Sequence, residues 1–215
     1  MRWKFILGLL TICAVLMSMS YTMLIPFLPM YLIQDLGVVK ADVDMWSGAI
    51  FAITFLVSGI MAPIWGALAD KKSRKLMALR AGFCLAITYF LGGLVTNPWE
   101  LLGVRFIQGL SAGLWPALLA IISVESPKLK LGFCMGVMQG GMTAGGVLGP
   151  LFGGLLADQF GMRMAFFIAA AALFLITLAL LFFVKEEPRK PDPNAKPVKI
   201  WDFSLCKIPA VKRML

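Results

Sequence analysis

Six long apolar stretches, each close to the length of a membrane-spanning helix, limit what this chain of 215 residues can fold into. A helix needs about 20 apolar residues to cross the hydrocarbon core of a bilayer. Hydrophobic residues make up 60% of the sequence and charged residues only 14%, which differs strongly from the balance of a water-soluble domain. The stretches predict six transmembrane helices, at about residues 5–34, 46–69, 76–96, 99–123, 132–157 and 162–184.

The basic residues fall almost entirely on one side of these predicted helices. They gather near the two chain ends, at residues 71–80 and at residues 128–130. The other connections hold mainly carboxylates. The net charge of +9 would suggest nucleic-acid binding in a soluble protein, but here it follows the membrane topology. By the positive-inside rule we expect a multi-pass protein of the cell membrane with both ends cytoplasmic, with the lipid bilayer as partner and no nucleic acid.

The sequence offers little for metal or enzyme chemistry. Histidine is absent, and the four cysteines show neither metal-ligand nor disulfide spacing, so we expect no metal and no cofactor. An intramembrane enzyme would need a nucleophile with a base, or a metal cluster, inside the bilayer. No such combination is visible, and the sequence predicts a protein that is not an enzyme.

A short phrase occurs twice, three predicted helices apart. Residues 66–70 read Gly-Ala-Leu-Ala-Asp and are followed by Arg74, and residues 154–158 read Gly-Leu-Leu-Ala-Asp and are followed by Arg163. An inverted repeat of three plus three helices would place the two copies on opposite sides of the membrane. Chance identity between short apolar sequences is the alternative explanation.

The composition changes after residue 184. Residues 185–215 are basic and interrupted by prolines, and residues 200–208 mix apolar with charged side chains. We expect residues 1–184 to form the six-helix bundle and residues 185–215 to form a cytoplasmic linker with an amphipathic segment on the anionic inner leaflet. Such a linker predicts a second six-helix half, so the sequence is expected to be truncated relative to a complete protein of two such halves.

A charged loop follows the second predicted helix, with Gly66, Asp70, Arg74 and Lys75 in the series Gly-Ala-Leu-Ala-Asp-Lys-Lys-Ser-Arg-Lys. Gly66 would let its helix approach a partner closely, and Asp70 could pair with Arg74. Glu125 ends the fourth predicted helix on the same side and could join them in an ion cluster. We predict that these five residues form a conformational switch. The alternative is a set of topology-setting cations with a solvated carboxylate.

Arg105 is a charged residue deep inside a predicted span, and Gln108 follows one turn later. A buried arginine is costly, so it should face the bundle interior or a wet cavity. Because it does not release its proton, its expected role is to tune a nearby acid or to hold acceptors. A structural hydrogen-bond centre is the alternative. No carboxylate lies in the middle of a predicted span.

The fifth predicted helix carries Gly141, Gly145, Gly149 and Gly153 at intervals of four residues, together with Pro150 and Gly154. Glycines at that spacing form a flat ridge that permits close helix packing, and Pro150 removes a backbone donor and would permit a bend. Close packing alone, without functional meaning, is the alternative.

These three motifs resemble the major facilitator superfamily, and the resemblance covers nearly all of the chain. The loop at 66–75 is similar to the signature loop of that family, with Ser73 where glycine is usual. Residues 105–109 are similar to its helix-four motif, in which the arginine is linked to proton transfer, so the resemblance makes Arg105 and Gln108 candidates for proton coupling and leaves the proton carrier unidentified. Residues 145–154 are similar to the helix-five motif of its drug:proton antiporters. The resemblance implies an all-α membrane protein that has the N-terminal half of that fold. It further implies a transporter that exports small amphipathic drugs or toxic compounds by alternating access, driven by protons.

Three alternatives share the predicted fold. An importer of a nutrient such as a sugar would keep the loop but gives no reason for the helix-five glycines. A second copy of the chain could replace the second half and recreate a twelve-helix bundle. The chain could also be a non-functional or regulatory half-transporter.

Transporter sites lie near the bilayer midplane between the two halves. Aromatic and methionine side chains suit a pocket that accepts varied ligands. The candidates for the substrate cavity are Tyr21, Met23, Phe27, Phe51, Phe55, Trp115, Met138, Gln139 and Met142. Contact with lipid or with another helix is the alternative for each of them.

Overall fold

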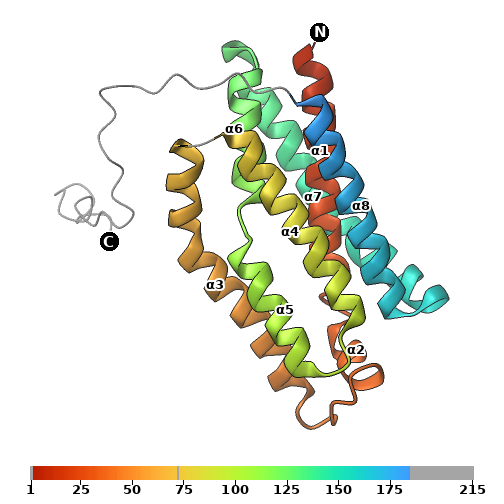
Figure 1. The fold of residues 1–215 in the computed structure, drawn as a ribbon. Coiled ribbons are helices and arrows are strands. Elements are labelled where there is room, and N and C mark those ends of the chain that lie inside the picture. Colours follow the sequence, from red (N-terminus) through yellow and green to blue (C-terminus); the bar gives the residue numbers. More distant parts are fainter. Residues whose placement is uncertain (1, 72, 185–215) are drawn as a thin grey trace, which may run out of the picture.

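The structure, a computed structural model, describes residues 2–71 and 73–184, without the side chains of Arg2, Asp70 and Lys71. Within these residues the chain is helical, which confirms the predicted all-α class (Figure 1). The elements are α1 (Arg2–Met23), α2 (Leu28–Gln34), α3 (Val43–Lys71), α4 (Arg74–Leu94), α5 (Pro98–Leu110), α6 (Leu114–Glu125), the short 3-10 helix η1 (Lys128–Lys130), α7 (Leu131–Phe160) and α8 (Met162–Phe183). The predicted linker at 185–215 lies outside the described residues.

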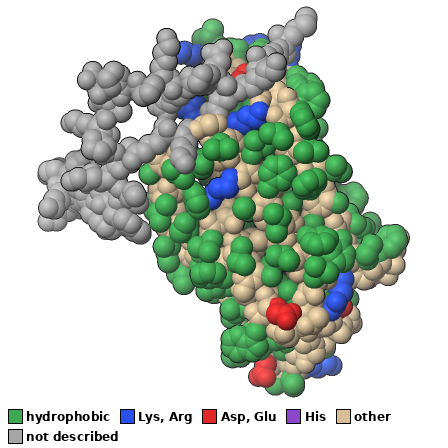
Figure 2. Space-filling model, viewed as in Figure 1, with side chains coloured by type: hydrophobic (Ala, Val, Ile, Leu, Met, Phe, Trp, Pro, Cys, Tyr) green, Lys and Arg blue, Asp and Glu red, His purple; other side chains and the backbone are tan. Residues whose placement is uncertain are grey.

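Six segments of the described chain are long and apolar enough to cross a membrane. They are Trp3–Met23, Val43–Ala69, Arg74–Leu94, Pro98–Glu125, Lys128–Phe160 and Met162–Phe183. We number them as spans one to six, and α2 continues span one after a turn. Figure 2 shows hydrophobic side chains along the length of the bundle on the face in view, as a surface in contact with lipid requires.

Two spans that the sequence predicts as continuous helices are divided. Span one is interrupted at residues 24–27, which include Pro26, and Pro29 lies in the first turn of α2. Span four is interrupted at residues 111–113, where Gly113 has φ +119°, a conformation that side chains disfavour. Each of these spans opens a group of three, but the interruption follows 22 helical residues in span one and 13 in span four, so it lies near the end of the first span and in the middle of the fourth.

The main helix interfaces are consistent with the predicted inverted repeat. The three most extensive join α1 to α7, α4 to α8, and α3 to α5. They pair span one with five, three with six, and two with four. If spans one, two and three are exchanged with spans four, five and six in that order, the same three pairs result. An inverted repeat requires this.

The glycine ridge of α7 faces α1 along its whole length. A Cβ atom on Gly141 would lie 2.7 Å from Thr11 Cγ2, and one on Gly153 would lie 2.6 Å from the Met23 carbonyl oxygen. At Gly145 and Gly149 it would collide with the backbone of Val15 and the hydroxyl of Thr22. The four glycines therefore allow the two helices to touch through their backbones. The helix passes Pro150 without an interruption.

Charged side chains lie mostly at the two ends of the bundle. We call the end that carries Lys4, Lys75, Lys128 and Lys130 the basic end. The opposite end carries a mixture of charges, with acidic side chains visible in Figure 2. The charged residues at this end are Asp35, Lys40, Asp42, Asp44, Glu100, Asp158 and Arg163.

Candidate functional site

A cavity of about 400 Å³ is lined by residues of spans one to five and is partly open, since the lining residues Ile25 and Phe55 are exposed. Four predicted residues line it: Tyr21, Phe55, Trp115 and Met142. Residues 111–116, at the interruption of span four, supply six consecutive positions of its wall. The lining is mainly apolar, with a few hydroxyl groups and the Gln108 amide, a composition suited to an amphipathic molecule.

The other five predicted cavity residues lie elsewhere. Met23 is buried against Gly153, and the ring of Phe27 lies against Gly154, so both belong to the packing around α7. Met138 is fully buried in the core, and Phe51 is half-buried and packs against the core. Gln139 is exposed on the surface of α7. Helix packing takes up most of these side chains because α7 turns its glycine face toward α1.

Arg105 and Gln108 form a buried polar pair behind the cavity. Their side chains are 6% and 3% exposed, and Arg105 Nη1 donates to Gln108 Oε1 at 3.0 Å. Gln108 lines the cavity, whereas Arg105 lies deeper, beside Tyr89 and Phe166. Among the described residues, Arg105 Nη2 and Gln108 Nε2 make no hydrogen bond of good geometry, although the Tyr89 hydroxyl interacts with both side chains and the Tyr21 hydroxyl with Gln108. A buried donor without a partner is costly, so this pair is suited to receive an acceptor from a ligand or another segment.

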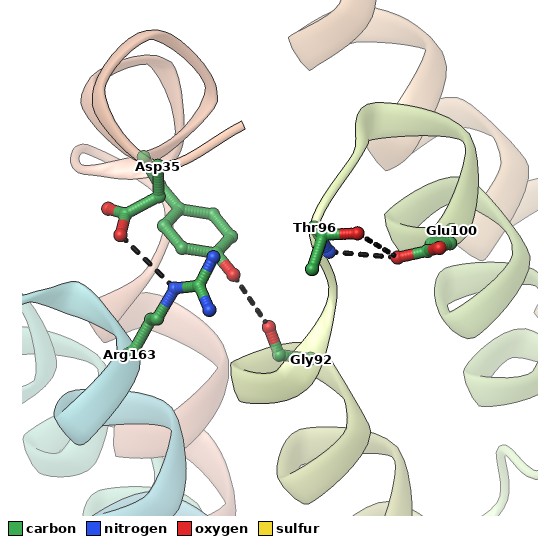
Figure 3. A network of polar contacts seen from close by, with 6 residues as sticks. Asp35, Gly92, Thr96, Glu100 and Arg163 are labelled. Atoms are coloured by element: carbon green, nitrogen blue, oxygen red, sulfur yellow. Dashed lines mark hydrogen bonds and ion pairs between the residues drawn. The ribbon is translucent and has the colours of Figure 1, made fainter. Parts of the chain in front are cut away.

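The chain positions Arg105 through the start and the packing of α5. Asn97 caps the helix by accepting from Glu100 N at 2.9 Å, and Pro98 follows in the first turn. Glu100 Oε2 in turn accepts from Thr96 N at 2.8 Å (Figure 3). Gly109 brings α5 onto α3, since a Cβ there would lie 2.8 Å from the Thr54 carbonyl oxygen.

Trp65 and Arg80 contact the interruption in span four, and neither was predicted as a site residue. Trp65 Nε1 donates to the Leu110 carbonyl at 2.8 Å, and Arg80 Nη2 donates to the Ala112 carbonyl at 3.0 Å. The guanidinium carbon of Arg80 lies 3.3 Å from the centroid of the Trp65 ring. A signal was present in the sequence: Arg80 lies in the second turn of α4, within a span, where a cation needs a partner.

The charged loop is described only in part. Ser73 has φ −69° and caps α4, accepting from Leu76 N at 3.0 Å, so no left-handed turn is needed at that position. Lys75 Nζ donates to the Leu181 carbonyl in the last turn of α8 at 2.6 Å. A Cβ on Gly66 would meet nothing within 4 Å among the described residues.

The predicted ion cluster at this loop stays a prediction. The side chain of Asp70 lies outside the described residues, and Glu125, the last residue of α6, is half-buried. Arg74 begins α4, on the same end of the bundle.

The second copy of the repeated phrase makes an ion pair at the opposite end. Arg163 Nε lies 3.2 Å from Asp35 Oδ1 (Figure 3). Asp158, within the phrase itself, is exposed. Close by, the Tyr31 hydroxyl donates to the Gly92 carbonyl at 2.9 Å, and its ring packs on Phe166. Together these contacts attach α2 to α4 and α8.

Comparison with known proteins identifies the family. The family model named Major Facilitator Superfamily matches residues 10–212. The chain belongs to the major facilitator superfamily. It is 42% identical over 186 residues to the multidrug resistance protein MdtG of Citrobacter koseri, and 40% identical over 187 residues to MdtG of Yersinia enterocolitica. Each match covers 86% of this chain but only 46% and 45% of the relative, so the chain spans about half the length of the curated relatives it matches.

Solved structures show the same fold for this superfamily member. A bacterial homologue of the human lysosomal transporter Spinster matches with a TM-score of 0.73 and 23% identity, over 92% of this chain and 46% of that one. The POT family transporter PepTSo matches with a TM-score of 0.73 and 14% identity, over 87% and 40%. The chain therefore has the fold of the N-terminal half of a major facilitator transporter and is a multi-pass membrane protein.

Proposed function

We propose that this chain is half of a proton-coupled exporter of amphipathic drugs or toxic compounds that works by alternating access. The observation that carries the proposal is the 400 Å³ cavity, where Tyr21, Trp115 and Met142 surround a mainly apolar space next to the buried Arg105–Gln108 pair. Aromatic and methionine side chains can adapt to ligands of different shape. The matched relatives named multidrug resistance protein support the same class of substrate.

Arg105 acts electrostatically in this proposal. A guanidinium group keeps its proton at working pH, so Arg105 cannot carry the coupled proton itself. Every carboxylate whose side chain is described lies near an end of a span: Asp35, Asp42, Asp44, Glu100, Glu125 and Asp158. The donors Arg105 Nη2 and Gln108 Nε2 would instead bind an acceptor that changes its protonation during transport, supplied by the other half or by the substrate.

The second half would pack on the free faces of α3 and α7. Added Cβ atoms would meet nothing within 4 Å at six glycines of these two helices: Gly48, Gly59 and Gly66 on α3, and Gly132, Gly136 and Gly140 on α7. Small residues permit close approach of another helix in a membrane. The second half would come from the same longer chain or from a second copy. Residues 185–215 would connect or flank it on the cytoplasmic side of the cell membrane, where both ends are expected.

Import of a nutrient such as a sugar is the second candidate function. The packing of α7 against α1 accounts for the spacing of the glycine series, so that series by itself does not distinguish export from import. The relatives' name, multidrug resistance protein, supports export.

The test is accumulation of a fluorescent amphipathic dye, ethidium, in cells with and without a protonophore. Residues 1–215 alone should give no proton-dependent efflux, whereas the chain extended by the second half of an MdtG relative should export the dye. Arg105→Ala in the extended chain should abolish that efflux. Efflux that persists in full with the protonophore would contradict proton coupling, and uptake in place of efflux would favour the importer.

A further inference from the structure

We propose that Trp65 and Arg80 are positioning residues of the substrate cavity, which hold the interruption in span four and thereby set the shape of the cavity wall. The assignment rests on the transport function proposed above. Neither side chain lines the cavity, so both would act through residues 111–116.

The interruption creates a need for hydrogen-bond donors. The last carbonyl groups of a helix have no intrahelical donor, and inside a membrane an unpaired carbonyl group is costly. The backbone meets part of this need, because Ser111 N donates to the Ile107 carbonyl at 3.1 Å. The Leu110 and Ala112 carbonyls accept instead from side chains of two other helices, Trp65 on α3 and Arg80 on α4.

The two side chains form one unit, which we call the Trp65–Arg80 clamp. The guanidinium carbon lies 3.3 Å from the centroid of the indole ring, a stacking geometry that arginine favours. Gly113 lies directly beside this unit, since a Cβ on it would be 3.6 Å from Arg80 Nη2 and 3.8 Å from Trp65 Cβ. The clamp therefore holds the point at which the direction of the chain changes.

The held segment is a large part of the cavity wall. Residues 111–116 are six consecutive lining positions, and they include the Trp115 side chain. A change in the φ and ψ angles at Gly113 would turn Trp115 and the Ser111 hydroxyl relative to Tyr21 and Phe55 across the cavity. The clamp is thus placed to determine which ligand shapes the cavity accepts.

The experiment uses two conservative changes and reads the wall directly. Trp65→Phe keeps an aromatic ring but removes the Nε1 donor, and Arg80→Lys keeps the charge but removes the planar group. Each is combined with Ser111→Cys in the chain extended by the second half of an MdtG relative. Serine or alanine first replaces Cys13, Cys84, Cys134 and Cys206, and the protein is studied in membranes. The measured quantity is the rate at which a small maleimide alkylates the new cysteine.

We expect each change to alter the alkylation rate by about fivefold, because Trp65→Phe removes a hydrogen bond to the segment and Arg80→Lys removes the stacking on Trp65 that orients the second donor. The matched controls are Trp99→Phe and Lys128→Gln, at two exposed positions away from the cavity, and these should leave the rate unchanged. The double variant should not exceed the larger single effect by more than the experimental error, since both side chains act on one segment.

Three results would overturn the proposal: rates within twofold of the parent in both variants, equal changes in the controls, or fully additive effects in the double variant. A loss of folded protein with an unchanged alkylation rate per folded molecule would also overturn it, because that is the result of a purely structural role. The alkylation readout does not depend on transport. A parent protein that fails to export ethidium would therefore refute the proposed function without deciding this inference.

Discussion

Spans one and four are both divided, but they are held in different ways. In span one the segment after the turn, α2, is attached by its own side chains, since Tyr31 reaches the Gly92 carbonyl and Asp35 pairs with Arg163. In span four the interruption itself is held, by Trp65 and Arg80 from neighbouring helices. The first interruption is marked by prolines and the second by a glycine with positive φ.

The difference shows that two corresponding spans of a repeat can be divided by different chemistry and at different points along their length. Prolines predispose span one to turn wherever it is placed, because they lack the backbone donor that a helix needs. Span four depends on tertiary contacts, since an isolated glycine permits a helix to continue at modest cost. We therefore expect the first interruption to tolerate local changes in its surroundings better than the second.

The largest effect should come from the contact between α7 and α1, the first helix of span one. Gly149→Leu would insert a side chain where α1 and α7 touch through their backbones, and it should cost at least about 2 kcal/mol. The measurement is the fraction of detergent-solubilised protein that elutes as a single folded species in gel filtration. Both variants are made in residues 1–215 alone, where Gly136→Leu, on the face of α7 proposed to receive the second half, is the control and should elute normally. Equal losses in the two variants would show that α7 is sensitive to any large side chain.

A smaller effect is expected at the interruption in span four. Gly113→Ala places a Cβ at φ +119° and should lower stability by about 1–3 kcal/mol. The melting temperature of the purified protein measures this. Gly103→Ala, in the regular part of α5 with open space around it, should leave the melting temperature unchanged or raise it. An equal melting temperature for Gly113→Ala and the parent would remove the distinction between the two interruptions.

Tyr31→Phe should loosen α2 and leave α1 unchanged. It removes the hydrogen bond to the Gly92 carbonyl, which is worth about 1 kcal/mol, while keeping the ring on Phe166. Backbone amide hydrogen exchange should therefore speed up about fivefold in α2. The amides of α1 are the internal control, and faster exchange there to the same extent would mean that span one behaves as one rigid unit.

The smallest effect is expected from the ion pair at the end of α2. The side chains of Arg163 and Asp35 are 40% and 27% exposed, so Asp35→Asn should cost no more than about 1 kcal/mol. Exchange in α2 should rise slightly at low salt, and the difference from the parent should shrink at high salt because exposed charges are screened. Asp42→Asn, an exposed carboxylate in the next connection, serves as the control. A larger effect than that of Tyr31→Phe would show that the charge pair, rather than the aromatic contact, holds α2.

Much of the fold could be predicted from the sequence. A bilayer requires about 20 apolar residues per span, so apolar length marks the helices directly. The two interruptions were not predicted, because apolar residues continue through residues 24–27 and 111–113 and hydropathy does not register a change of direction. Pro26 and Pro29 were a usable signal for the first, whereas Gly113 is one glycine among many.

The site could be predicted less well. A charge inside a span is rare and needs a partner, which is why the burial of Arg105 and its bond to Gln108 could be expected, while their role in proton coupling stays a prediction. That Met138 lies in the core and not in the cavity wall could not be foreseen, because composition does not show which face of α7 is turned to the core. Trp65 and Arg80 reach carbonyl groups 45 and 32 residues away, and contacts at such separations have no pattern in a single sequence.

The contact between α1 and α7 also has a consequence for the order of events during synthesis. Thr22 and Gly145, which meet in this interface, are 123 residues apart. At about 5–20 residues per second, a ribosome needs on the order of ten seconds to make the intervening chain. The most extensive interface of the finished bundle therefore cannot guide the insertion of its own first helix. The translocation machinery must place and orient α1 from its apolar length and its basic flank alone, before the glycine ridge exists.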